Sequence, residues 1–200
     1  MTRRKLVIGI TGNIATGKTA VVQMLDDLGA DTIDADGLVH QMMGPGSALA
    51  ESLAAEFGPE VVNDDRSINR PALGQIVFSD VDKLRRLEEL IHPHVVERMV
   101  AAIHEPGADV LVLDAIKLFE AGIADHCDEV WVVDADIEAR IARLKARNDI
   151  DEPEALRRIN AQPPQEEKLA RADRVIDNGG TLEDTRAQVE ALWHELTTQR

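Results

Sequence analysis

The sequence predicts an α/β fold in which five parallel strands form a doubly wound sheet. Two observations lead to this prediction: short apolar segments rich in Val and Ile, and amphipathic segments that follow them along the chain. Apolar runs without polar alternation are typical of strands buried on both faces, as in parallel sheets. Strand–helix alternation favours right-handed crossovers, which place helices on the faces of such a sheet.

The expected strands are the five apolar runs Leu6–Ile10, Asp31–Ile33, Val110–Leu113, Val130–Val133 and Val175–Ile176. Helices are expected over Thr19–Leu28, Ala48–Phe57, Leu84–Ile103, Ile137–Arg147 and Glu183–Leu196. Asn69 and Pro71 mark a further helix start, because Asn caps helices and Pro suits the first turn. The long helical pattern is expected to kink or restart at His92-Pro93, since the residue before proline avoids the α region.

Length and composition limit the classes of protein. The 200 residues suit one domain, or one domain with an inserted subdomain. The 22 basic and 37 acidic residues give a net charge of −15, which disfavours nucleic-acid and membrane partners because both need a basic surface. Cys127 is the single cysteine in the sequence, so a disulfide framework is excluded. The apolar run Leu6–Ile10 is too short for an export signal, and we expect a cytoplasmic protein.

One motif predicts chemistry directly. The segment Gly12-Asn13-Ile14-Ala15-Thr16-Gly17-Lys18-Thr19 matches the pattern G-x-x-x-x-G-K-[ST] between an expected strand and an expected helix. Its glycines let the backbone approach phosphate closely, and its N–H groups offer partial positive charge to the anion. Lys18 is expected to reach the β- and γ-phosphates of a nucleoside triphosphate, and the Thr19 hydroxyl to ligate Mg²⁺. The motif therefore predicts a P-loop NTPase-type fold.

Carboxylates follow several expected strands, where open α/β sheets bind ligands. Asp34 and Asp36 follow the second strand; one could accept the proton of an acceptor hydroxyl, and the other could orient water or a metal. A structural role for this pair stays open. In the similar sequence at 134–136, we expect Asp136 to cap the next helix. Asp114 either ends its strand or acts on Mg²⁺ through water.

Three arginines form a possible phosphate clamp. Arg140, Arg143 and Arg147 are three and four residues apart, so they share one face of a helix. They either pair with Glu138 and Asp149 on a solvated face or bind phosphate, for which Arg is well suited. A chain with a net charge of −15 needs a local positive region to hold an anionic substrate.

The long gap between the second and third expected strands is helical in pattern. We expect residues 38–104 to form a helical insertion and residues 148–172 to form a small, mobile helical flap. The nucleotide-binding core then comprises residues 1–37, 105–147 and 173–200.

Together, these residues resemble the dephospho-CoA kinase family along nearly the whole chain. The similarity rests on short segments in the family's order and spacing: Ile8–Gly12, Asp34–Asp36 with His40, Asn69-Arg70, Ile91–Pro93, Leu118–Gly122, Arg143–Arg147 with Gln162, and Ala172-Asp173. The resemblance implies that ATP, with Mg²⁺, phosphorylates the ribose 3′-hydroxyl of dephospho-CoA, giving CoA and ADP. It also implies a P-loop kinase core with strand order 2-3-1-4-5, in which residues 38–104 are the helical acceptor-binding insertion and residues 148–172 are the lid.

The resemblance further implies residue roles. ATP would be held by Thr11 and by residues 12–19, with Asp36 as the catalytic base and Lys18, Arg143 and Arg147 acting on the transferring charge. The acceptor site is expected to include Asp34, Asp36, His92, Lys117, Leu118 and Glu120. His92 is also explained as a buried histidine at a helix break.

The chain departs from the family pattern at two places. Ile116-Lys117-Leu118 stands where the family has Pro-Leu-Leu, so Lys117 either contacts a phosphate or marks a subfamily. The family also favours Gly-Ile-Gly-Ser at residues 13–16, where this chain has Asn-Ile-Ala-Thr.

Two alternative functions stay open at this point: a related P-loop nucleoside or nucleotide kinase, and a nucleotide-controlled binding switch. The switch is disfavoured because the sequence contains no Asn-Lys-x-Asp motif for reading guanine. We expect ATP and dephospho-CoA as small-molecule partners and a monomer or weak homo-oligomer.

Overall fold

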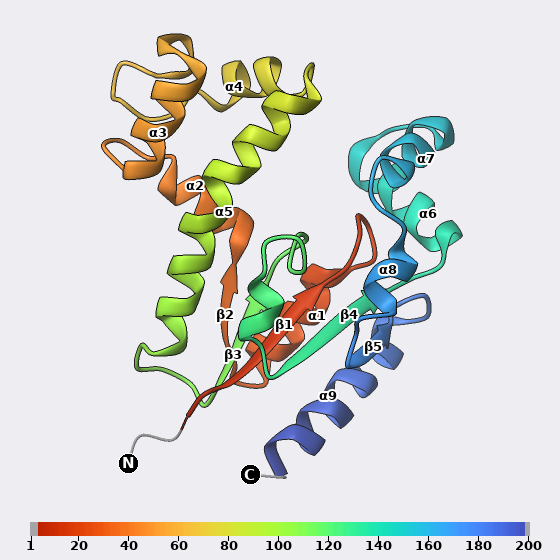
Figure 1. The fold of residues 1–200 in the computed structure, drawn as a ribbon. Coiled ribbons are helices and arrows are strands. Elements are labelled where there is room, and N and C mark those ends of the chain that lie inside the picture. The colour runs from red at the N-terminus through yellow and green to blue at the C-terminus, as the bar shows by residue number, and fades with distance from the viewer. Residues whose placement is uncertain (1–3, 199–200) are drawn as a thin grey trace. The chain divides into compact units, whose positions relative to one another are not determined.

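The computed structural model describes residues 4–198. Its five strands are β1 (Leu6–Thr11), β2 (Asp31–Asp34), β3 (Val110–Asp114), β4 (Glu129–Asp134) and β5 (Arg174–Asp177). They form one sheet in the order β2-β3-β1-β4-β5, in which β1 pairs in parallel with β3 and β4, and β4 with β5 (Figure 1). The α/β class, the five-stranded parallel sheet and the strand order are confirmed. Each strand contains its predicted segment and extends it by one residue at one end or at both.

The helices are α1 (Lys18–Asp27), α2 (Ala35–Met42), α3 (Ala48–Phe57), α4 (Arg70–Val77), α5 (Val81–Ile103), α6 (Ile137–Asn148), α7 (Glu152–Asn160), α8 (Gln165–Leu169) and α9 (Leu182–Thr198). Two short 3₁₀ turns lie at Pro59–Val61 and Ile123–His126. None of these helices combines the length and apolar character that a membrane span needs, within the part of the chain that is described. The described chain divides into two compact units, residues 4–32 with 105–198 and residues 33–104.

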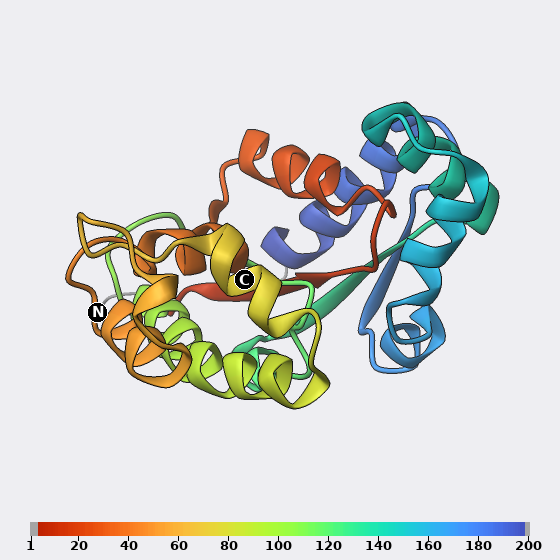
Figure 2. The same cartoon turned by 90° about the horizontal axis from the view of Figure 1, so that it is seen from above.

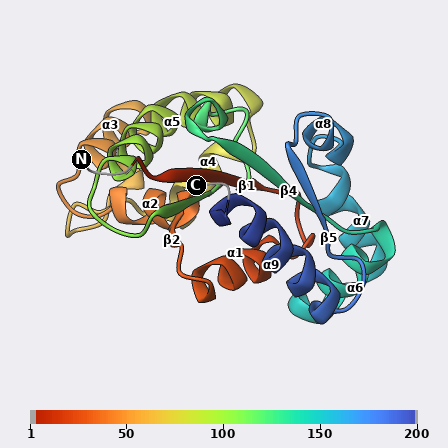
Figure 3. The same cartoon turned by 90° about the horizontal axis from the view of Figure 1, so that it is seen from below.

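The first unit contains the sheet, except for the last two residues of β2, and its main core. Helices α1 and α9 lie side by side over one face of the sheet (Figures 2 and 3). Alternate residues of β1 point toward them, because successive strand side chains face opposite sides. Ile8 and Ile10 are fully buried there with Leu25 of α1 and Val189 of α9. This packing fixes the end of β1 from which the phosphate loop begins.

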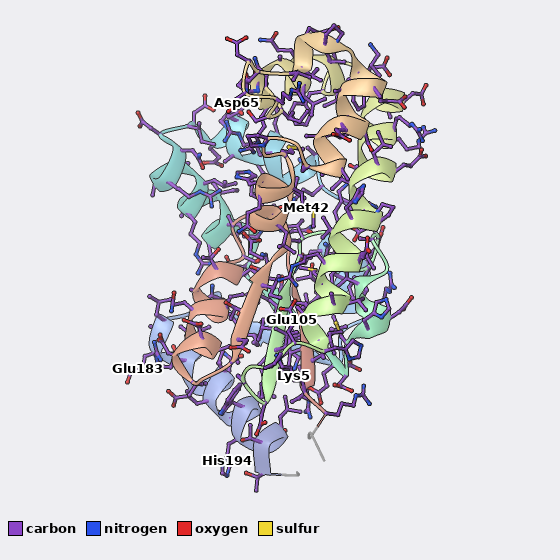
Figure 4. All side chains as sticks on the ribbon, turned by 90° about the vertical axis from the view of Figure 1, so that its left-hand side faces the viewer. Lys5, Met42, Asp65, Glu105, Glu183 and His194 are labelled. Carbon is purple, nitrogen blue, oxygen red and sulfur yellow. The ribbon has the colours of Figure 1, made fainter. Side chains whose placement is uncertain are left out.

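The exposed residues of α9 are mainly polar, although Leu182 at its start is also exposed. Figure 4 labels Glu183 near the start of this helix and His194 near its end, and both side chains are exposed.

The second unit is helical and has a core of its own. Most side chains of this core come from α3, α4 and the segment between them, and they include Leu53, Phe57, Leu73 and Val77. Asn69 caps α4 by accepting the N–H of Ala72, and Pro71 lies in the first turn, as predicted. Figure 4 labels Met42 at the end of α2 and Asp65 in the loop before α4.

Helix α5 differs from the prediction. Of the kink or restart expected at His92-Pro93, the restart is wrong, because α5 continues from Val81 to Ile103 with Pro93 inside it. The kink stays a prediction. Proline removes a backbone hydrogen bond in such a position, which destabilises a helix. Ile91 packs against the second unit's core and Met99 is fully buried, so burial on both sides of the proline outweighs the local preference.

Candidate functional site

The phosphate loop, residues 12–19, joins β1 to α1 and contains two left-handed residues. Ala15 has φ 65° and Gly17 has φ 92°. Gly17 is the N-cap of α1, so the N–H groups of Lys18 and Thr19 open the helix and have no acceptor within it. Partial positive charge gathers at such a helix start. The backbone therefore presents N–H groups that an anion can accept.

Two guanidinium groups from α6 hold the carbonyls of this loop. Arg140 Nε donates to Ile14 O at 3.0 Å, and Arg143 Nη1 donates to Ala15 O at 3.2 Å and to Thr16 O at 3.1 Å. In a trans peptide, the C=O and the following N–H point in opposite directions. The arginines bind the carbonyls of Ile14 and Thr16 on one side of the loop. The N–H groups of the following residues, Ala15 and Gly17, therefore face the other side.

Asn178, which follows β5, supports the same turn. Its Nδ2 donates to Thr16 O at 2.7 Å, and its Oδ1 accepts the Thr185 hydroxyl at 2.8 Å. Arg143 Nη2 donates to the Asn178 carbonyl at 2.5 Å. A Cβ at Gly17 would overlap Asn178 Nδ2, so this close approach requires glycine at position 17. Asn178 and Thr185 were not among the predicted site residues, since their relation to the loop is long-range.

Lys18 pairs with Asp114 at the end of β3. The Lys18 Nζ and an Asp114 carboxylate oxygen form an ion pair, and the two side chains are 14% and 9% exposed. Asp114 therefore holds the Lys18 ammonium beside the loop. Sequence analysis left the role of Asp114 open, and this contact gives it a partner in the site.

Hard oxygen ligands suitable for Mg²⁺ are present at the same place. The Thr19 hydroxyl lies in the first turn of α1 and is exposed, and the Asp114 carboxylate belongs to the Lys18 pair. Within residues 4–198, no group of three or more His, Cys, Asp or Glu side chains could hold a metal. Mg²⁺ commonly binds through one or two protein oxygens, substrate phosphates and water, so this sparse donor set fits it.

The segment 162–168 also contacts the loop. Gln165 Oε1 accepts the Asn13 N–H at 3.0 Å, and Gln162 Oε1 accepts the Ile14 N–H at 2.6 Å. In return, Asn13 Nδ2 donates to the Pro163 carbonyl at 2.8 Å. Gln165 was missed by sequence reasoning, because a glutamine in a polar segment gives no signal of burial.

Lys168 lies further along α8 and is buried. Its Nζ donates to Thr11 Oγ1 at 3.3 Å and to the Ile116 carbonyl, and it lies 3.9 Å from a Glu120 carboxylate oxygen. Burial lowers the pKa of Lys168; Glu120 opposes this shift, and two nearby lysines add to it. The ammonium therefore joins the end of β1 to the segment after β3.

The other predicted residues of the first unit have different surroundings. Leu118 is fully buried, and a Cβ at Gly9 would meet its Cδ2 at 2.9 Å, so Leu118 packs on β1. Lys117 and Glu120 are exposed. Arg147 is exposed on α6 and donates to Asn148 Oδ1 at 3.2 Å.

Asp34, Asp36 and His92 belong to the second unit, whereas Lys18 and the other predicted site residues belong to the first. The unit contains a cavity of about 390 Å³ that Asp36 lines. Arg70 Nη1 lies 3.2 Å from His40 Nδ1 at this cavity, whose other lining side chains are mainly apolar. Phe78 is 80% exposed there. His92 is half-buried in the middle of α5.

The two Asp-Ala-Asp sequences both cap helices. Asp34 is the N-cap of α2, and its carboxylate accepts the N–H groups of Asp36 at 3.1 Å and Gly37 at 3.0 Å. Asp136 is the N-cap of α6 and accepts the Ala139 N–H at 2.6 Å, as predicted. In residues 34–36, the Asp34 carboxylate holds the backbone N–H of Asp36. The Asp36 side chain is then left to line the cavity.

Comparison with known proteins gives consistent matches. Residues 6–184 match the family model described as dephospho-CoA kinase. The chain is 48% identical over 190 residues to the dephospho-CoA kinase of Symbiobacterium thermophilum, covering 94% of this chain and 80% of that protein. It is 45% identical over 193 residues to that of Geobacter metallireducens, covering 95% and 96%.

Solved structures have the same fold. The chain is similar to TT1252 from Thermus thermophilus, with a TM-score of 0.80, 35% identity and coverage of 96% of this chain and 98% of that one. A shikimate kinase from Bacteroides thetaiotaomicron has a TM-score of 0.51 at 16% identity, covering 96% and 98%, and this likeness concerns the fold alone.

Proposed function

The chain belongs to the dephospho-CoA kinase family, and on that premise we propose that it transfers the γ-phosphoryl group of ATP to the ribose 3′-hydroxyl of dephospho-CoA. Members of this family are phosphotransferases that convert dephospho-CoA to CoA, and the chain has this activity by its membership. The observation that supports this function is the family match over residues 6–184, a range that includes the phosphate loop and the second unit. The position phosphorylated, the metal and the residue roles are our proposal.

We assign ATP to the phosphate loop. Its β- and γ-phosphates would accept the N–H groups of Ala15, Gly17, Lys18 and Thr19, which the backbone geometry leaves available. The Lys18 ammonium would exchange part of its contact with Asp114 for phosphate oxygens. A site of this kind stabilises developing charge with donors that are already oriented, so little reorganisation is needed at the moment of transfer. Thr11 would line the end of this site through its contact with Lys168.

Mg²⁺ would be held by the Thr19 hydroxyl, with Asp114 as a nearby carboxylate. When bound with ATP, the ion would neutralise negative charge on the phosphates. Arg143 and Arg147 are proposed to add positive charge from α6, and the contacts of Arg143 support a second task, the orientation of the loop carbonyls.

Asp36 is proposed as the general base that accepts the proton of the 3′-hydroxyl. Its position at the cavity of the second unit supports this role. Asp34 would act through Asp36, because its carboxylate holds the N–H of Asp36 at the start of α2. A base in a fixed position contributes typically 10²- to 10⁴-fold to a rate.

The cavity of the second unit is proposed to hold part of the acceptor. Its apolar walls suit the less polar parts of dephospho-CoA, and Arg70 beside His40 suits a phosphate oxygen. We therefore propose residues 38–104 as the acceptor-binding insertion, and the compact unit 33–104 supports these bounds. His92 remains a predicted acceptor residue.

Lys117, Leu118 and Glu120 are proposed as the part of the acceptor site after β3. The exposed side chains of Lys117 and Glu120 suit direct contact with a ligand. Leu118 is buried, so its contribution would be to hold the segment against β1.

An acceptor series tests the proposal. ADP release is measured with ATP and Mg²⁺ alone, with dephospho-CoA, and with adenosine or AMP at equal concentration. We expect acceptor-dependent ADP release with dephospho-CoA and little with the others. Equal or faster release with adenosine or AMP would favour the related nucleoside or nucleotide kinase, and equal release without any acceptor would contradict a kinase assignment.

A further inference from the structure

We propose that Gln162 and Gln165 are positioning residues that couple the predicted lid to the phosphate loop, so that nucleotide binding at the loop orders the lid. The inference rests on the proposed function in one respect, that residues 12–19 bind the phosphates of ATP. It adds residues from outside the motif to that site.

Gln165 makes more hydrogen bonds at this place than Gln162 does. Its side chain is buried, and it accepts the Asn13 N–H at 3.0 Å while its Nε2 donates to the Val133 carbonyl at 3.0 Å. One amide group thus joins α8, the start of the loop and the end of β4. A buried backbone N–H or C=O that loses its partner is costly, so all three elements are held in register.

The segment divides the loop's N–H groups into two sets. Those of Asn13 and Ile14 are occupied by Gln165 and Gln162, while those of Lys18 and Thr19 open α1 and face no acceptor within it. The first set is used by the protein, and the second is left for an anion. A displacement of segment 162–168 would release the first set and loosen the loop.

Apolar packing continues this coupling into α7. Ile14 and Ala15 lie against a small buried cluster formed by Leu144 of α6 with Ala155 and Ile159 of α7. The loop therefore contacts the predicted lid in two ways. It forms hydrogen bonds with Gln162 and Gln165, and its side chains pack against α7. Coupling between two sites is reciprocal, so ordering the loop must favour the ordered lid, and the converse.

Hydrogen exchange with and without ADP tests the coupling. In the wild type, we expect ADP to slow exchange in residues 12–27 and also in residues 152–169. In Gln165→Ala, slowing in 12–27 should persist at saturating ADP, while slowing in 152–169 should be lost. We also expect the Kd for ADP to rise about tenfold, as for the loss of one or two buried hydrogen bonds.

Three further variants make the test specific. Gln188→Ala also removes side-chain bonds to backbone, at an exposed place: its Oε1 accepts the Asp177 N–H, and its Nε2 donates to the Asp177 and Asp184 carbonyls. This variant should keep the wild-type response. Gln162→Ala removes a single bond from a half-buried side chain, which gives a milder variant should Gln165→Ala not fold. Gln162→Glu retains an acceptor for Ile14 and should respond more like the wild type than Gln162→Ala does.

The outcomes separate this inference from the proposed function. An ADP-dependent slowing in 152–169 that survives in both alanine variants would overturn the coupling, as would an equal loss in Gln188→Ala. Slowing in the wild type that is confined to 12–27 would also overturn it while leaving nucleotide binding intact. Failure of the wild type to bind ADP would overturn both proposals.

Discussion

Replacement of Gly17 by alanine tests how the phosphate loop is built. Gly17 has φ 92°, and a left-handed conformation costs an L-residue roughly 1–2 kcal/mol. The added Cβ would also overlap Asn178 Nδ2, which donates to Thr16 O and is buried. Loss of that bond adds about 1–3 kcal/mol, so we expect a decrease of about 2–5 kcal/mol in the free energy of unfolding.

Gly29→Ala is the matched control. Gly29 has φ 100° in the same unit, but a Cβ there meets no atom within 4 Å. It should lower the free energy of unfolding by roughly 1–2 kcal/mol and leave ATP binding unchanged. Urea unfolding gives both stabilities, and calorimetry gives the Kd for ATP, which we expect to rise more than tenfold in Gly17→Ala alone.

Equal losses in the two variants would refute the reasoning, because the contact with Asn178 would then contribute nothing. If Gly17→Ala binds ATP with the same Kd as the wild type, the position of the N–H group of residue 17 is unimportant for phosphate binding.

Three further predictions concern single side chains. Asp36→Asn should lower kcat by about 10²- to 10⁴-fold and leave the Kd for ATP nearly unchanged; turnover at the wild-type rate would remove Asp36 as the base. Lys18→Ala should weaken ATP binding and lower kcat, and thermal unfolding should show a loss of stability because the buried Asp114 carboxylate loses its cationic partner. Burial, followed by the charges of nearby aspartates, raises the pKa of the Cys127 thiol to about 12. The thiolate is thus scarce at pH 8, and we expect a disulfide reagent to label folded protein much more slowly than urea-unfolded protein; equal rates would show that the thiol is not protected.

Features that depend on local sequence were predictable. The strands follow from continuous apolar runs, and the caps at Asn69 and Asp136 follow from side chains that bond to the next turn of backbone. The phosphate loop was found because its residues are consecutive. Each of these features is encoded within a few residues, so no knowledge of the rest of the fold is needed.

Features that depend on distant contacts were not predictable. Pro93 favours a helix break locally, but the burial of α5 on both sides of it prevails. Gln165 and Asn178 reach the loop from more than 150 residues away, and no local pattern identifies the loop atoms that their side chains meet. Arg140 and Arg143 were placed on one helix face, but a spacing of three residues does not identify the carbonyls that they meet.

Identification of the product tests the central claim most directly. The protein is incubated with ATP, Mg²⁺ and dephospho-CoA, and the acceptor is analysed by mass spectrometry, with the position of the new phosphate determined by NMR. We predict one added phosphoryl group on the ribose 3′-oxygen, formed in equal amount with ADP. Unmodified dephospho-CoA in a sample that binds ATP, or a phosphate at another position, would contradict the account.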